Sequence, residues 1–584
     1  MSDADDEFQV RPGRPRDGGV KGDRAKSFVG QVMQAANKGG RGARGYGPRR
    51  KGGSVSRFGR GAAAAPRRTR RASDRRVVVK MRIVQHRGLK FRAASLTRHV
   101  SYLEREGVTR DGAPGRLFDA AGDQADGDAF AERCKDDRHH FRFIISPEDA
   151  SEMQDLRAFT RELMADAQRD LGTSLDWVAV DHWNTDDPHI HVLVRGRADD
   201  GGDLVLSRNY IREGFRQRAE DRVTLELGPR TQREIQAALG REVDADRWTS
   251  LDRSLRDIAD RHAGIVDLRP EPGWAGYDNN QLLIGRAQKL ERLGLADSIG
   301  PGAWTLKPGI EETLRDLGVR GDIIKTMHKA MARDTPMPDA TRFAIHAGPP
   351  SDPIIGRLVD RGLHDELNGS AYAVVDGIDG RTHHLRFDDI DMTGDARPGA
   401  IVELRSWEDA KGRQRLSLAT RSDLPLGQQI TADGVTWLDR NLVARDQPAL
   451  GGGFGADVAA AMDARSDHLV KEGLAERRGQ RVIFARALIE TLKDREMIAA
   501  KTEIVTRTGL APLPSIPGEH VAGLYRERVT LASGRFAMID SGFGFQLVPW
   551  RPALEQHLGQ HVSGTIMPGG GVDWTFGRQR GLGL

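Results

Sequence analysis

Alternating and helical patterns of hydrophobic residues divide the chain after residue 76 into strands and helices. Runs of β-branched and aromatic residues predict strands at 77–84, 139–147, 175–183, 189–196 and 204–206. Leu96, Val100 and Leu103 recur at helical spacing and predict a helix over 91–107. A second long helix is expected from about 147 to 171. Strands interleaved with long helices, two of them joined by a short turn, predict an α+β fold with a central, largely antiparallel sheet flanked by helices.

The second half of the chain repeats one pattern. Segments 289–318 and 468–496 both read as a helix, a Gly-Leu-Ala turn, a strand hairpin and a further helix, which is the outline of a winged helix. Segments 370–407 and 534–550 alternate like small β-barrels. We therefore expect winged-helix-like and small β-barrel accessory domains, with domain boundaries at 1–75, 76–225, 226–335, 336–425, 426–505 and 506–584.

Length and composition narrow the class of protein. A chain of 584 residues is too long for one hydrophobic core, so several domains are expected. No segment is long and apolar enough to span a membrane, and the N-terminus is polar where a signal peptide would be apolar, so we expect a cytoplasmic protein without membrane insertion. The single cysteine, Cys134, leaves His, Asp and Glu as the candidate metal ligands.

Positive charge is concentrated at one end of the chain. Residues 1–80 hold 21 Lys and Arg against 7 Asp and Glu, a net charge of +14, whereas residues 81–584 carry a net −9. A basic Arg/Gly-rich arm, predicted to be disordered over 1–75, favours binding to a polyanion such as nucleic acid. A solubilising tail remains the alternative.

The segment 179–196 carries the most chemistry. His189 and His191 are two residues apart at the start of a strand, so their side chains leave the same face of the sheet. His182 ends the preceding strand, and the turn between the strands can bring all three imidazoles to one point. Three neutral imidazoles suit a divalent ion and leave coordination positions for a substrate. Asp181 or Asp186 could orient one of the ligands.

A nucleophile is also needed. Tyr102 lies near the end of the helix HVSYLEREG, just before a Gly-rich loop. A phenol with an ordinary pKa of about 10 needs a base or an activated electrophile to react at neutral pH. Taken alone, Tyr102 could equally be an aromatic residue at the edge of the core.

Together these segments resemble the relaxases, or mobilisation nucleases, of the HUH endonuclease superfamily. Tyr102 in HVSYLEREG, the segment HFRFIIS ending at Ser146, and HWNTDDPHIH with His182, His189 and His191 occur in the order and approximate spacing of the three relaxase motifs. The resemblance covers about residues 80–225. It implies an HUH-type nuclease domain with Tyr102 as nucleophile, the three histidines as metal ligands and Ser146 as a contact to DNA near the scissile phosphate.

The resemblance implies a function as well. A relaxase nicks one strand at a plasmid or mobile-element transfer origin, forms a 5′-phosphotyrosyl link to DNA, and reseals the strand by the reverse reaction. It implies a divalent metal cofactor, Mg²⁺ or Mn²⁺. The implied partners are single-stranded DNA at the origin, relaxosome accessory proteins and a type IV secretion coupling protein.

One departure and three alternatives stay open. Many relaxases have Asp two residues after the first motif-three histidine, where this chain has Asn184, so a catalytic base could instead be Asp181 or Asp186. The same residues would serve a rolling-circle replication initiator. A non-catalytic DNA-binding protein with a structural ion, or a zinc hydrolase, is also compatible with three histidines.

Overall fold

The computed structural model describes residues 59–62, 64, 71–86, 92–104, 108–183, 188–269, 279–332, 339–346, 348–350, 352–410, 412–568 and 570–575. The chain divides into two compact units, residues 1–322 and 323–584. The finer division into six domains stays a prediction. The expected basic arm over 1–75 lies almost entirely outside the described residues.

A four-stranded antiparallel sheet forms the centre of the first unit. Its strands are β1 (Val77–Gln85), β2 (His139–Pro147), β3 (Trp177–His182) and β4 (His189–Arg195), in the order β1-β2-β4-β3. The bounds of β2 are those predicted from its hydrophobic run, and the other three differ by one or two residues at an end. The α+β class with antiparallel sheets is therefore confirmed.

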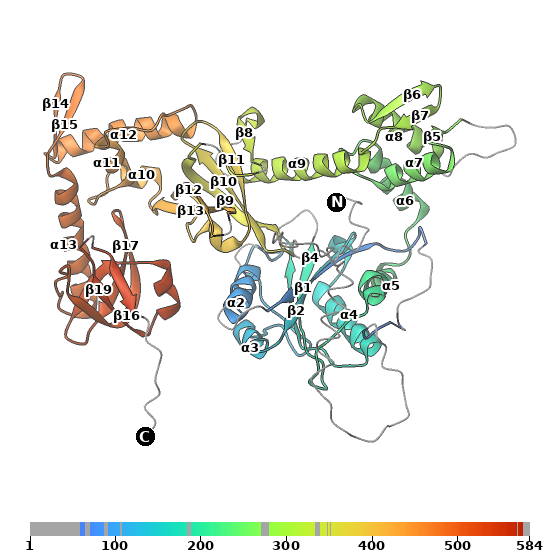
Figure 1. The fold of residues 1–584 in the computed structure, drawn as a ribbon, viewed down its shortest axis with the longest axis horizontal. Helices are drawn as coiled ribbons and strands as arrows, with labels where there is room; N and C mark the ends of the chain where they lie inside the picture. Colours follow the sequence, from blue (N-terminus) through green and yellow to red (C-terminus); the bar gives the residue numbers. More distant parts are fainter. Residues whose placement is uncertain are drawn as a thin grey trace. The chain divides into compact units, whose positions relative to one another are not determined.

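Two pairs of helices cover the two faces of this sheet (Figure 1). One face packs its apolar side chains against α4 (Leu156–Leu171) and α5 (Phe215–Leu227), in a core that includes Phe141, Phe143 and Ile145. The other face packs against α2 (Arg92–Leu103) and α3 (Gly127–Arg133), in a core that includes Val180 and Leu193. Alternate residues of each strand thus face different helix pairs, as the pleat requires.

Two local predictions for this unit were wrong. The helix expected from about 147 begins at Leu156, because Asp155 accepts hydrogen bonds from the Arg157 and Ala158 amides as an N-cap, and a short 3₁₀ turn (Ala150–Glu152) precedes it. The strand expected near 204–206 is reduced to isolated bridges, Arg60 to Leu206 and Arg197 to Asp203. The first helix ends at Leu103, and residues 105–107 lie outside the described residues.

The rest of the first unit is mostly helical. It contains a single-turn π-helix at Tyr210–Gly214, followed by helices around a three-stranded sheet of order β5-β7-β6. The elements are α6 (Gln232–Val243), α7 (Ser250–Arg261), β5 (Ile265–Asp267), α8 (Asn280–Arg292), β6 (Ala296–Gly300), β7 (Ala303–Leu306) and α9 (Ile310–Met331), of which the residues from Ile323 onward belong to the second unit. Trp248, Leu255, Leu290 and Leu314 are buried in its core.

The second unit contains two larger sheets. The first has the order β13-β12-β9-β10-β11-β8, and the second the order β18-β17-β16-β19-β20. The strands are β8 (Phe343–Ile345), β9 (Ile355–Asp365), β10 (Ser370–Gly377), β11 (Thr382–Phe387), β12 (Ile401–Glu408), β13 (Gln414–Ser422), β16 (His520–Leu531), β17 (Gly534–Asp540), β18 (Phe545–Pro549), β19 (His561–Ile566) and β20 (Val572–Thr575). Short 3₁₀ turns lie at Ala340–Arg342, Ile390–Thr393 and Pro552–His557.

The predicted β-barrels are corrected to open sheets. In a barrel the first and last strands pair, whereas in the described residues β13 and β8 end one sheet and β18 and β20 end the other. Alternation along a strand fixes which side chains share a face but does not encode the stagger that closes a sheet, so the sequence pattern could not separate the two outcomes.

Helices and a hairpin complete the second unit. They are α10 (Leu426–Gln429), α11 (Trp437–Leu442), α12 (Phe454–Lys471), β14 (Ala475–Arg478), β15 (Arg481–Phe484) and α13 (Leu488–Thr508). The helix, hairpin and helix predicted at 289–318 and at 468–496 are both present, as α8, β6–β7 and α9 and as α12, β14–β15 and α13. Within the described parts of the chain, no helix combines the length and apolar character needed to cross a bilayer.

A buried histidine should make the second unit sensitive to acid. His384 on β11 stacks on Tyr372, and burial lowers its pKa to about 4, against about 6.5 in an unfolded chain. Because the folded state favours the neutral ring, the contribution of His384 to the free energy of unfolding is complete above pH 6.5. This contribution is lost as the pH falls towards 4. We expect acidification across this window to lower the free energy of unfolding by about 3 kcal/mol.

Urea denaturation at several pH values checks this expectation in the wild type and in His384→Phe. The phenyl ring keeps the stacking on Tyr372 but does not titrate, so the variant should lose less stability on acidification. Equal losses in the two proteins would show that His384 is not responsible.

Candidate functional site

The pleat of the four-stranded sheet places the three predicted ligands on one face. His182 on β3 lies directly opposite His189 on β4, and His191 lies opposite Val180. Val180 belongs to the core beneath α2 and α3, so the three histidines share the face covered by those helices. All three side chains are buried.

The three imidazoles converge at one point. The ring centroids lie 5.5 Å apart for His182 and His189, 4.6 Å for His182 and His191, and 5.0 Å for His189 and His191. Each ring offers a nitrogen within 4.8 Å of those of the other two. Since neutral imidazole nitrogens bind divalent transition metals, this group could hold a metal ion. The convergence predicted from the spacing of the histidines is therefore present.

A backbone carbonyl orients one of these rings. The Nε2 atom of His182 lies 2.8 Å from the carbonyl oxygen of Leu103, at the end of α2. A carbonyl oxygen can only accept, so Nε2 must carry the proton, and in the neutral ring the lone pair is then on Nδ1. A histidine ligand usually donates its second N–H to such a group, so this hydrogen bond prepares Nδ1 for a metal.

The candidate nucleophile, Tyr102, is the neighbour of the residue that makes this hydrogen bond. Tyr102 directly precedes Leu103 on α2, and its partly buried ring packs against the core beneath the helix. The last turn of α2 is thereby tied to the strand that carries His182. Tyr102 thus directly precedes Leu103, whose carbonyl oxygen contacts His182 of the cluster.

Ser146 lies beside the cluster as well. It follows Ile145, whose register partner on β4 is Ile190, and its hydroxyl lies 3.3 Å from the carbonyl oxygen of Pro188, the residue before His189. Its side chain is buried on the same face as the histidines, because Ile145 faces the opposite core. Ser146 is therefore close to the start of β4, as its predicted role requires.

A chain of hydrogen bonds holds a buried arginine on this face. Arg142 Nε donates to His140 Nε2 at 3.1 Å, His140 Nδ1 lies 2.7 Å from His86 Nε2, and His86 Nδ1 lies 2.8 Å from the carbonyl oxygen of Asp137. Because the chain begins at a cation and ends at a carbonyl, every proton in it is assigned and both rings are neutral. Burial, together with the neighbouring Arg142, lowers the pKa of His140 well below its usual range.

These hydrogen bonds hold the positive charge of Arg142 near the three ligand histidines. Arg142 lies opposite Leu193, two residues along β4 from His191. On β1, Lys80 and Arg82 point to the same face, because Val79 and Met81 between and beside them face the opposite core. This basic strip, Lys80, Arg82 and Arg142, would attract an anion towards the cluster.

Of the two aspartates expected to orient a ligand histidine, Asp181 and Asp186, only Asp181 lies in the described residues. Asp181 points to the other face of the sheet, where its carboxylate accepts hydrogen bonds from Arg157 Nε and Trp183 Nε1, both at 2.8 Å. It therefore does not orient a ligand histidine. Asn184 and Asp186 lie outside the described residues, so the role expected for Asp186 stays a prediction.

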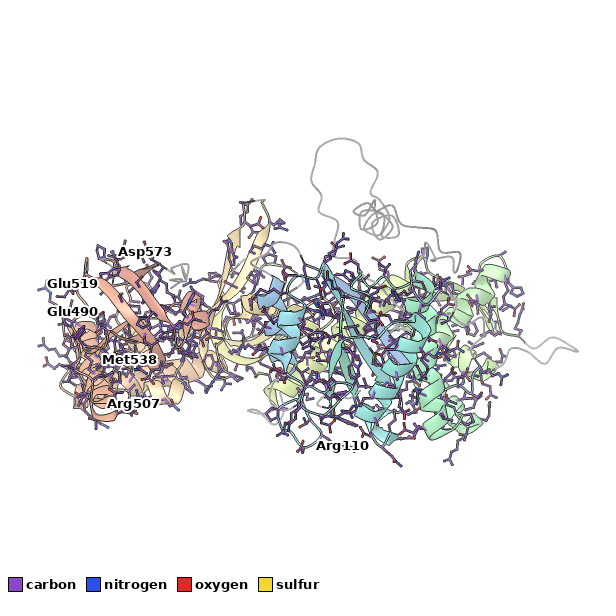
Figure 2. The ribbon with its side chains drawn as sticks, turned by 90° about the horizontal axis from the view of Figure 1, so that it is seen from below. Arg110, Glu490, Arg507, Glu519, Met538 and Asp573 are labelled. Carbon is purple, nitrogen blue, oxygen red and sulfur yellow. The ribbon has the colours of Figure 1, made fainter. Side chains whose placement is uncertain are left out.

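The residue just before the turn at 184–187, Trp183, is anchored by two contacts. The Trp183 amide donates to the Val108 carbonyl at 2.6 Å, and the guanidinium carbon of Arg110, labelled in Figure 2, lies 4.5 Å from the centre of the Trp183 ring. These contacts hold the segment after α2 against the residue that follows His182.

Three features of the site were missed from the sequence. The Leu103 carbonyl is backbone, so no residue type signals it. Arg142 and His140 lie in the segment read as motif two, and alternation from Ser146 could have placed them on its face. The partner of His140, His86, lies 54 residues away and could not be paired with it by spacing.

Comparison with family models gives a match over the second half of the chain. The model of a family described as proteins of unknown function, DUF3363, matches residues 283–415 and 405–583. No curated protein and no solved structure matches. The histidine cluster lies outside the matched residues.

Proposed function

Because this chain belongs to the DUF3363 family, whose description assigns no function, its role has to be argued from the site, and we propose that it is a DNA relaxase. It would nick one strand at a transfer origin through Tyr102 and later reseal it. The observation that carries the proposal is the convergence of His182, His189 and His191 beside the end of the helix that bears Tyr102.

Each residue of the site has a part in this proposal. The basic strip Lys80, Arg82 and Arg142 would hold the phosphates on either side of the cleavage point, and the Ser146 hydroxyl would contact the strand near the start of β4. His140 and His86 keep the Arg142 guanidinium in place without adding charge. When bound by the three histidines, a divalent ion such as Mn²⁺ or Mg²⁺ would neutralise charge on the scissile phosphate.

The chemical step is a transesterification. The Tyr102 oxygen attacks phosphorus in line, a Tyr–O–P bond forms, and the bond from phosphorus to the 3′-oxygen breaks. The phenolic proton passes to a base, for which Asp186 is the candidate, and the departing 3′-oxygen gains a proton. Since one phosphate ester replaces another, the 3′-hydroxyl can reverse the step without ATP. The strand-linked protein would then pass to relaxosome and type IV secretion partners.

A cleavage assay tests the proposal. The protein is incubated with supercoiled plasmid that carries the DNA flanking its own gene, with Mn²⁺, Mg²⁺ or a chelator, and is then denatured. We expect a metal-dependent nick with protein attached to the 5′ end. A nick without attached protein would instead indicate attack by water and would favour a metal hydrolase.

Metal binding can be tested without cleavage. His191→Gln removes one imidazole from the cluster and should weaken Mn²⁺ binding by about 100-fold or more in titration calorimetry. His139→Gln is the matched control, because His139 lies on the same sheet but on the face opposite the cluster, where its ring packs against Phe141 and its Nε2 lies 3.0 Å from the Leu204 carbonyl oxygen. Equal affinities of the two variants would show that the cluster is not the metal site.

A further inference from the structure

The helix–hairpin–helix arrangement occurs twice, and each copy contains a buried Arg–Asp ion pair, which we call its lock. In the first copy, Arg286 donates to both carboxylate oxygens of Asp252, at 2.7 and 2.9 Å. In the second, Arg465 donates to both oxygens of Asp439, at 2.8 and 2.9 Å. All four side chains are fully buried. Each arginine also donates to backbone carbonyls that precede the helix bearing its aspartate.

The surroundings of the two locks share several features. Both aspartates close a capping box, with Thr249 in the first copy and Thr436 in the second. Both arginine helices are followed, two residues after their end, by a glycine with positive φ, Gly294 (71°) and Gly473 (69°), which lies four residues after a buried leucine. The two hairpins that follow have two-residue turns. The pairs that close the two hairpin turns can therefore be compared.

The tips of the two hairpins differ sharply in charge. In the first copy the pair that closes the turn is Gly300 and Ala303, and residues 298–303 contain no charged side chain. In the second copy the closing pair is Arg478 and Arg481, preceded by Arg477, and all three are exposed. Like charges directly opposite one another destabilise a strand pair. An arginine pair at this position therefore costs stability that the first copy avoids.

Both faces of this tip are cationic. Successive residues of a strand point to opposite faces, so Arg477 projects on one side and the Arg478 and Arg481 pair on the other. Arg477 pairs with Asp467 and Arg478 with Glu476, but exposed ion pairs contribute only about 0–1 kcal/mol and exchange readily for another anion. Figure 1 shows the hairpin projecting beyond the helices that carry it.

We propose that the β14–β15 hairpin binds double-stranded DNA by entering a groove, where its arginines contact the phosphates of both walls. A ribbon with cations on both faces fits between two rows of phosphates, whereas an acidic protein surface would meet one face only. The major groove of B-DNA admits a two-stranded β-ribbon. The preceding helix exposes Asp457, Asp463 and Asp467, so the hairpin and not α12 makes the contact. This proposal does not rest on the reaction proposed for Tyr102.

Salt dependence of binding to a short duplex of arbitrary sequence tests it, with the full-length protein and a chelator to prevent cleavage. Each phosphate contact adds about 0.9 to the slope of log affinity against log salt, so Arg477→Gln/Arg478→Gln/Arg481→Gln should lower the slope by about 3. The corresponding triple lysine variant should keep it. The glutamine variant should unfold at the same or a higher temperature, because the like-charged pair is gone.

A matched control removes three exposed arginines from another ribbon of the same unit. Arg405→Gln/Arg413→Gln/Arg421→Gln, with Arg405 on β12, Arg421 on β13 and Arg413 just before β13, changes the net charge equally and should leave most of the slope intact. Equal slopes for the wild type and the hairpin variant overturn the proposal. If the variant at the same time binds polyglutamate more weakly, the hairpin recognises an acidic protein surface and not DNA. If the triple variant does not fold, Arg481→Gln alone should lower the slope by about 1.

Discussion

Tyr102→Phe should abolish the covalent link between the protein and the 5′ end of nicked DNA. The substitution removes only the phenolic oxygen, which is the proposed nucleophile, and the ring that packs against the core beneath α2 is kept. We expect nicking to fall by at least about 10³-fold, since loss of a nucleophile has costs of this order or more. DNA binding and Mn²⁺ binding should stay at the wild-type level.

Tyr210→Phe provides the matched control. Tyr210 is in the same unit, is buried, and donates its hydroxyl to Asp170 at 3.1 Å, away from the histidine face. Its variant should nick DNA at the wild-type rate and lose about 1 kcal/mol of stability with the hydrogen bond. If Tyr102→Phe still forms an adduct, another residue is the nucleophile and the proposed reaction fails in its central step.

Asp439→Ala should destabilise the second unit by about 3–5 kcal/mol. The substitution leaves the fully buried Arg465 guanidinium without its carboxylate and also removes the cap of α11. Carbonyls of Ala432 and Gly434 remain as acceptors but cannot neutralise the charge. Thermal unfolding of the full chain should show the transition of this unit at a clearly lower temperature.

A second variant separates the buried charge from the loss of the cap. Asp439→Ala/Arg465→Met removes both partners, so it should be less damaging than Asp439→Ala alone. Glu476→Ala breaks an exposed ion pair in the same copy and should cost less than about 1 kcal/mol. A double variant as unstable as the single one would show that the cap, and not the uncompensated arginine, dominates.

Local periodicity was enough to predict the strands of the first sheet and the face shared by His182, His189 and His191. Strand side chains alternate whatever the rest of the chain does, so a two-residue spacing fixes a common face. The start of α4 was misjudged because acidic residues after Pro147 resemble a first helical turn, whereas Asp155 is the residue that caps it.

Contacts between distant segments could not be predicted in this way. The pairing of His86 with His140 and the locks joining Asp252 to Arg286 and Asp439 to Arg465 each depend on tertiary packing. The similarity of 289–318 and 468–496 was visible in the sequence, but both the aspartates and the arginines of the locks lie before those segments. Closure of a sheet into a barrel likewise depends on all of its strands. This explains why β-barrels were predicted where the structure has open sheets.

The carbonyl that orients His182 belongs to the main chain, and this has a consequence for mutational tolerance. Any non-proline residue at position 103 that keeps the end of α2 intact still presents the same oxygen, so side-chain scanning would score the position by its packing alone. The orienting group is thus insensitive to substitution and sensitive to anything that shifts the end of the helix. Insertions or deletions in the last turn of α2 should therefore harm the site more than most replacements within it.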